Sequence, residues 1–242
     1  MFKEIKKLNE EFYNWAAVEL NDPDNTNPYL IIPDERYRNA SFRILVLGKE
    51  TNGWGDAEKC TSVDALEKLY RDKVLERNFS GCGYPFWEFY FSCIWDNLKE
   101  RPDIGVCVSN VALLGKLYGK GHYKAKYAPE LSYYLRRYIH ALKPDAIICF
   151  FGTDGQAGPY LRILKSLWGP YSGDRDTILD PTCENSMRKL FFADSEGIEI
   201  YGTRHPQGAT NEWKQSIVNS ILKDIIPKPQ AEAKADGSAD EQ

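Results

Sequence analysis

The class of fold is indicated by one stretch, Phe42-Arg43-Ile44-Leu45-Val46-Leu47-Gly48-Lys49-Glu50-Thr51-Asn52-Gly53-Trp54-Gly55. An apolar run ends at Gly48, and a carboxylate and an amide follow it closely. Uninterrupted apolar strands are typical of parallel sheets that are covered on both faces. The turns after such strands carry polar groups into a crevice at the carboxyl edge of the sheet. We therefore predict a strand over 42–47, followed by a turn that brings Glu50 and Asn52 to a binding crevice.

Strand-like and helix-like runs alternate along the rest of the chain. Short apolar runs predict strands, and apolar residues at helical spacing predict helices. The expected strands are 42–47, 104–108, 146–151, 190–193 and 198–201, and the expected helices are 3–20, 62–74, 86–98, 129–142, 160–168 and 210–226. This alternation predicts an α/β fold, a three-layer α/β/α sandwich with a mostly parallel central sheet of about four strands.

The sequence indicates a single α/β domain over 1–226 with an N-terminal helical extension, because no linker-like stretch divides it. From Pro227 onward the composition is Pro, Ala, Lys, Glu, Asp and Gly, which has little apolar surface to bury. We expect 227–242 to be a disordered tail.

The overall composition excludes several classes of protein. The net charge of −4 argues against a broadly basic protein that coats DNA non-specifically. The six cysteines form no Cys-x-x-Cys pair, so we expect no zinc ribbon and no clustered iron–sulfur site. The chain opens with no secretory signal and has no apolar stretch long enough for a bilayer. We expect a cytoplasmic protein that has no membrane partner and no evident obligate protein partner. The lysines at 116, 120, 124 and 126 are expected to form a solvated basic loop.

A second polar turn, Tyr201-Gly202-Thr203-Arg204-His205-Pro206-Gln207-Gly208, follows the last strand-like run. If its strand is parallel to the first one in the same sheet, His205 faces the same crevice as Glu50. A carboxylate opposite an imidazole, with a slot the size of a base between them, indicates cleavage of a glycosidic bond. Hydrolysis of a glycosidic bond needs no metal and no organic cofactor, so we expect neither.

Five short motifs, taken in order, resemble those of the uracil-DNA glycosylase superfamily. They are Gly48-Lys49-Glu50-Thr51-Asn52, Gly83-Tyr84-Pro85-Phe86, Val106-Cys107-Val108-Ser109-Asn110, Phe150-Phe151-Gly152-Thr153 and Arg204-His205-Pro206-Gln207. The family has Gly-Gln-Asp-Pro-Tyr or Gly-Glu-Ala-Pro-Gly at the first position and His-Pro-Ser at the last. The resemblance covers roughly 42–226. It implies the uracil-DNA-glycosylase fold and hydrolysis of the N-glycosidic bond of a deaminated or damaged base in DNA.

The resemblance also implies roles for individual residues. One catalytic group stabilises the sugar cation or positions a water, and the other assists the departing base; the candidates are Glu50 and His205. A ring stacks on the extruded base and an amide reads its polar edge; the base-binding candidates are Gly48, Lys49, Asn52, Phe86 and Asn110. The candidate contacts to DNA phosphates are Thr153, Arg204 and Gly208.

Two features depart from the family pattern. Glu50 is one methylene longer than the aspartate of one branch, and the proline of the first motif is missing. After Pro206 the chain continues with Gln207-Gly208-Ala209, which offers no apolar wedge to push into a duplex. Single-stranded or damaged DNA, in which extruding a base costs less, is therefore a better expected partner than intact duplex.

Other interpretations stay open at this stage. The same fold could bind a base or nucleotide without cleaving it, or an unrelated α/β hydrolase could act on free nucleosides. A dinucleotide-binding enzyme is disfavoured, because no Gly-x-Gly-x-x-Gly follows the first strand. The candidates also have structural interpretations: Glu50 could pair with Arg43, Asn110 could cap a helix, and Phe86 could be a core ring.

Overall fold

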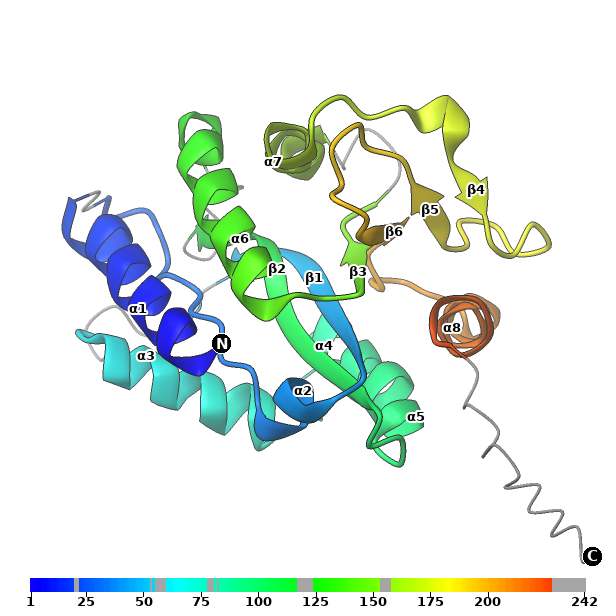
Figure 1. Ribbon diagram of the computed structural model, residues 1–242, viewed down its shortest axis with the longest axis horizontal. Helices are drawn as coiled ribbons and strands as arrows, with labels where there is room; N and C mark the ends of the chain where they lie inside the picture. The colour runs from blue at the N-terminus through cyan, green and yellow to red at the C-terminus, as the bar shows by residue number, and fades with distance from the viewer. Residues whose placement is uncertain are drawn as a thin grey trace, which may run out of the picture.

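The structure is a computed structural model that describes residues 1–19, 22–52, 54, 60–77, 81, 83–116, 124–152 and 158–227, with residues 50–52 described for their backbone. Its centre is a six-stranded sheet in the order β2-β1-β3-β6-β5-β4 (Figure 1). The strands are β1 (Phe42–Asn52), β2 (Ile104–Lys116), β3 (Ala146–Phe150), β4 (Thr177–Ile178), β5 (Arg188–Leu190) and β6 (Glu199–Thr203).

The expected α/β class is confirmed, and the expected number of strands is wrong. Strands β2, β1, β3 and β6 are parallel and correspond to the predicted runs. Two further strands, β5 and β4, extend the sheet antiparallel beyond β6. The expected strand over 190–193 overlaps β5 at Leu190 alone, and no strand is expected at β4. The two strands have only three and two residues, which is too short for an apolar run or an alternation to locate them.

Strands β1 and β2 both run further than the apolar pattern predicts. Beyond Leu47, where pairing with β3 ends, β1 continues to pair with β2 as a two-stranded ribbon. Gly48 lies opposite Asn110, and after a register shift Asn52 lies opposite Lys116. The polar residues of the first motif therefore lie on a paired strand and not in a free turn.

The helices and helical turns cover both faces of the sheet. They are α1 (Phe2–Tyr13), η1 (Asn14–Glu19), α2 (Glu35–Asn39), α3 (Val63–Tyr70), η2 (Arg71–Leu75), α4 (Pro85–Phe89), η3 (Tyr90–Trp95), α5 (Asp96–Leu98), η4 (Ala125–Tyr127), α6 (Ala128–Leu142), α7 (Gly158–Trp168), η6 (Gly173–Arg175), α8 (Asn211–Ser220) and η7 (Ile221–Ile225). Helices α1, α6 and α7 lie on one face (Figure 1), and their buried side chains belong to one core cluster there. Those of the α4–α5 run and α8 pack on the other face, which gives three layers.

Local signals of the sequence account for several helix ends. The Ser62 hydroxyl accepts a hydrogen bond from the Ala65 N–H and so caps the start of α3. Helix α6 ends at Leu142, and Lys143 takes a left-handed conformation with φ 51° before Pro144. The predicted tail from Pro227 lies, except for that residue, outside the described residues.

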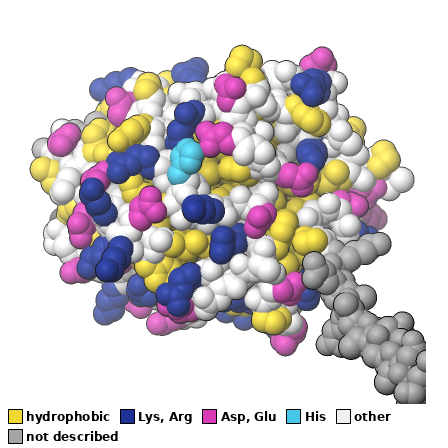
Figure 2. Space-filling view, viewed as in Figure 1, with side chains coloured by type: hydrophobic (Ala, Val, Ile, Leu, Met, Phe, Trp, Pro, Cys, Tyr) yellow, Lys and Arg dark blue, Asp and Glu magenta, His cyan; other side chains and the backbone are white. Residues whose placement is uncertain are grey.

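The molecule carries charges of both signs side by side. On the face shown in Figure 2, Lys and Arg side chains are interspersed with Asp and Glu side chains. This face therefore lacks the broad basic surface that non-specific DNA binding uses. Within the described part of the chain, no helix has the length and apolar character needed to cross a membrane.

Gly105 tests the packing of β2 against α2. A Cβ at this position would lie 2.6 Å from the Tyr37 Cα and 2.9 Å from the Ala40 Cβ, so the backbone would have to move. We expect Gly105→Ala to lower the free energy of unfolding by about 1–3 kcal/mol, measured as a lower urea midpoint. The matched control is Gly158→Ala, whose Cβ would meet no atom within 4 Å. Equal midpoints for the two variants would contradict this packing.

Candidate functional site

The carboxyl ends of the parallel strands bring the first and last motifs to the same edge of the sheet. Leu47 of β1 pairs with Cys149 of β3, and Cys149 pairs with Gly202 of β6. These three residues therefore form one row across the sheet, and Gly48 and His205 both follow that row. Adjacent strands lie about 4.8 Å apart, so two spacings separate β1 from β6 by roughly 10 Å.

Gly48 of the first motif has no side chain, and two other candidate residues lie close to where its Cβ would be. A Cβ on Gly48 would lie 2.5 Å from Asn110 Oδ1 and 3.3 Å from Phe86 Cζ. The Asn110 amide and the Phe86 ring are both buried, and they meet over the backbone of Gly48. A side chain at position 48 would displace at least one of them, so the site requires glycine there.

Phe86 also connects this group to the last motif. The rings of Phe86 and His205 lie 6.3 Å apart between centroids, with 26° between their planes. This is within the range of aromatic pairs in proteins. Four predicted site residues, Gly48, Phe86, Asn110 and His205, are thus brought together from β1, α4, β2 and the turn after β6.

The environment of His205 determines its protonation. The backbone N–H of Gln207 donates a hydrogen bond to His205 Nδ1 at 3.3 Å. The neutral imidazole that accepts there carries its proton on Nε2. Burial, and to a smaller extent the positive charge of Lys49, together lower the pKa of His205 to about 4. At neutral pH the side chain is therefore an uncharged imidazole that can donate from Nε2.

A segment near the N-terminus supports the outer part of this ribbon. Thr26 exchanges hydrogen bonds with the Gly115 backbone at 3.0 and 3.1 Å. The Asn27 amide donates to the Trp54 carbonyl at 3.4 Å. The Tyr29 ring packs on Trp54 with centroids 4.6 Å apart. No sequence motif predicts this support, although the apolar run that starts at Tyr29 signals burial.

The other candidates lie differently or outside the described residues. The guanidinium of Arg204 stacks on the Trp213 ring at 5.1 Å and borders an open hollow of about 620 Å³ between α8 and the loop before β5. Gly208 has a φ of +68° in the turn after His205. The side chains of Glu50 and Asn52, and all of Thr153, lie outside the described residues, so their assignments stay predictions.

The expected solvated lysine loop is wrong for Lys116. This side chain is only 5% exposed, and its ammonium lies 3.9 Å from the Asp24 carboxylate. The reason is the extension of β2, which carries Lys116 beneath the segment around Asn25. Lys124 pairs with Asp22 at 2.6 Å, while residue 120 lies outside the described residues.

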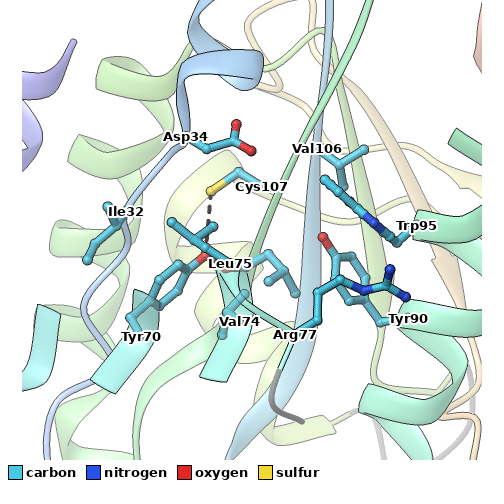
Figure 3. Close-up of a pocket in the computed structure, with 11 residues that line it drawn as sticks. Ile32, Asp34, Tyr70, Val74, Leu75, Arg77, Tyr90, Trp95, Val106 and Cys107 are labelled. Atoms are coloured by element: carbon cyan, nitrogen blue, oxygen red, sulfur yellow. Dashed lines mark hydrogen bonds between the residues drawn. The ribbon is translucent and has the colours of Figure 1, made fainter. Parts of the chain in front are cut away.

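A separate small cavity lies under β2, away from Phe86 and His205. Its lining includes Tyr70, Tyr90 and Cys107, and its volume is about 20 Å³, which suits one water molecule and not a nucleobase (Figure 3). Burial raises the pKa of the Cys107 thiol to about 12, so this group is protonated at neutral pH. The buried thiols at Cys107 and Cys149 are free. In the described ranges no three His, Cys, Asp or Glu side chains gather as metal ligands would.

The chain was compared with models of known protein families and with curated proteins, and neither comparison gives a match. The resemblance to the uracil-DNA glycosylase superfamily therefore depends on the five motifs.

The site predicts an unusual titration for His205. Its imidazole should titrate with a pKa of about 4 when followed by NMR of the ring protons. Lys49→Gln should raise this pKa, because removing a nearby positive charge relieves repulsion of the imidazolium, while burial keeps the pKa below 6.5. Lys99→Gln, on the helix end at α5, serves as the control and should leave it unchanged. A wild-type His205 that titrates near 6.5 would refute this account of the site.

Proposed function

We propose that the protein is a DNA N-glycosylase that hydrolyses the bond between a deaminated, uracil-type base and its deoxyribose. The observation that carries the proposal is the meeting of Gly48, Phe86, Asn110 and His205 at the carboxyl edge of the sheet. A ring, an amide and an imidazole in one place supply the groups that base recognition and base departure require.

The base would be bound by Asn110 and Phe86. Within the described part of the chain, no hydrogen bond engages the Asn110 side chain, so its donor and its acceptor remain available to a ligand. An amide can pair with two adjacent groups, such as the N3–H and a carbonyl oxygen of uracil. The Phe86 ring provides the apolar surface on which the base stacks.

The departing base would be stabilised by His205 and Lys49. As the glycosidic bond breaks, the electron pair moves to the base, and negative charge develops on its carbonyl oxygens. A neutral His205 can donate a hydrogen bond from Nε2 to such an oxygen. The charge of Lys49, which acts on His205 electrostatically, also favours the anion. The protein then needs no imidazolium for this step.

Glu50 is the proposed partner of the sugar. Its carboxylate would stabilise the positive charge on C1′ and accept a proton from the attacking water, whose hydroxyl becomes bonded to C1′. Its position two residues after Gly48 on β1 supports this role. Single-stranded DNA is the proposed substrate form, because Gln207 and Gly208 provide no wedge after His205.

A second candidate function is a binding module that holds the base without cleaving it. The backbone pairing of Glu50 with Ala112 favours this alternative, because a carboxylate on a paired strand has less freedom to position a water. The two functions share the same residues and differ in whether an abasic product forms.

Excision of uracil from oligonucleotides tests the proposed function. Wild-type protein should produce alkali-labile abasic sites, faster in single-stranded than in double-stranded DNA. Glu50→Ala and His205→Ala should each lower the single-turnover rate by about 10²-fold or more, because each removes transition-state stabilisation. The controls are His140→Ala and Glu196→Ala, which break an exposed pair remote from the site. Tight binding without product favours the binding module, and unchanged excision in both site variants refutes the assignment.

Gly48→Ala tests the close packing of Asn110 and Phe86 against Gly48 at the proposed base site. The new methyl group should push aside the Asn110 amide, the nearest atom at 2.5 Å, while the fold remains. Misplacing a positioning group by about 1 Å can cost 10²-fold in rate, so we expect a loss of this order in excision or base binding. Gly158→Ala introduces the same methyl group where it meets nothing and should leave the rate unchanged. Full activity of Gly48→Ala would contradict the role of Asn110.

A further inference from the structure

An exposed aromatic side chain lies close in sequence to Phe86, one of the four residues of the candidate site. Tyr84 is 44% exposed and stands two residues before Phe86, at the start of α4. Two residues span at most about 7 Å, so the Cα atoms of Tyr84 and Phe86 lie within that distance of each other. Four large hydrophobic side chains are exposed in the described ranges: Val18, Tyr84, Tyr133 and Ile178. Among these four, Tyr84 lies nearest in sequence to a residue of the candidate site, two positions before Phe86.

The backbone of Tyr84 is held on both sides. Gly83 takes a φ of +77°, which a side chain would disfavour, and its N–H donates to the Glu88 carboxylate at 3.0 Å. The Tyr84 carbonyl accepts from the Glu88 N–H at 3.0 Å. Pro85 then occupies the first helical position, where its fixed φ suits the helix.

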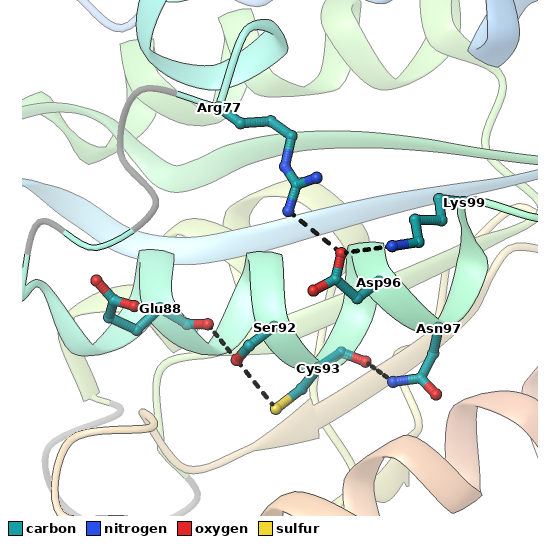
Figure 4. A network of polar contacts seen from close by, with 7 residues as sticks. All are labelled: Arg77, Glu88, Ser92, Cys93, Asp96, Asn97 and Lys99. Atoms are coloured by element: carbon teal, nitrogen blue, oxygen red, sulfur yellow. Dashed lines mark hydrogen bonds and ion pairs between the residues drawn. The ribbon is translucent and has the colours of Figure 1, made fainter.

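The helical run that follows Tyr84 in the sequence carries polar contacts along its length (Figure 4). The Ser92 hydroxyl donates to the Glu88 carbonyl, and the Asn97 amide donates to the Cys93 carbonyl at 2.8 Å. Asp96 lies between Arg77 at 3.2 Å and Lys99 at 3.4 Å. Tyr84 therefore stands at the start of a well-supported helical run. Because its backbone is already fixed, its exposed ring can stack on a nucleobase at a low entropy cost.

The last motif lacks an aromatic ring, which Tyr84 could supply. The turn after His205 presents Gln207 and Gly208, which are exposed and have no ring. If the protein bound a DNA strand through the target base alone, the neighbouring bases would make no contact with the protein. Aromatic side chains bind such bases by stacking, and each stacked base is worth about 1–3 kcal/mol.

We propose that Tyr84 is a stacking platform for a base next to the target base in single-stranded DNA. It positions the DNA strand so that the target base reaches the proposed base site at Phe86. The bases of a single strand have free faces, whereas those of a duplex already stack on each other. This role rests on the proposed function of the neighbouring site, and it holds equally if that site binds the base without cleaving it.

Fluorescence of 2-aminopurine tests the proposal. The probe is a single-stranded oligonucleotide with 2-aminopurine next to a uracil, and stacking on a protein ring changes its fluorescence. Tyr84→Ala should weaken binding by roughly 5- to 150-fold and abolish the fluorescence change, while Tyr84→Trp should keep both. The matched control is Tyr133→Ala, which removes a tyrosine that is 56% exposed on α6, and it should bind as the wild type does. In excision assays Tyr84→Ala should raise KM and leave kcat largely unchanged.

The outcomes separate this proposal from the proposed function. If wild-type protein binds the oligonucleotide through Tyr84 but forms no abasic product, the glycosylase assignment fails and the stacking role stands. If Tyr84→Ala binds like the wild type, or no more weakly than Tyr133→Ala, the stacking role is overturned. Failure of the wild type to bind single-stranded DNA overturns it as well.

Discussion

The site depends on the parallel pairing of β1 with β2 on one side and β3 on the other. This register places Gly48 opposite Asn110, and it places Leu47 in one row with Cys149 and Gly202. A slip of one residue would turn every side chain of the strand to the opposite face. The Asn110 side chain would then point away from Phe86, and the last motif would no longer begin at the same row of the sheet as the first motif.

The electrostatics of the site differ from those of the whole molecule. The chain is acidic overall, and the face in Figure 2 mixes both signs of charge. At the sheet edge, however, burial and Lys49 keep His205 neutral. A neutral donor next to a cationic group suits a ligand that becomes negative during reaction, because the charge appears on the ligand and not on the protein. The site therefore suits the anionic leaving base of the proposed reaction without requiring a basic surface.

The two antiparallel strands support the last motif. Because β5 covers β6, the strand that leads to His205 lies inside the sheet and not at its edge. The loop before β5 adds a second support, since the Asn185 carbonyl accepts hydrogen bonds from Thr203 and Trp213. Asn185 has a φ of +57°, a left-handed conformation that asparagine tolerates better than most residues. This bracing acts on the residues directly before the His205 turn.

The sequence by itself determined the α/β class, the four parallel strands, the main helices and the cap at Ser62, because these follow from local periodicity and local hydrogen bonding. It also singled out Gly48, Phe86, Asn110 and His205. Only the tertiary structure decided that these four meet, since their contacts join residues far apart in the chain. It also decided the length of β1 and β2, the two added strands and the burial of Lys116, because pairing between strands is non-local and leaves no periodic signal in either partner.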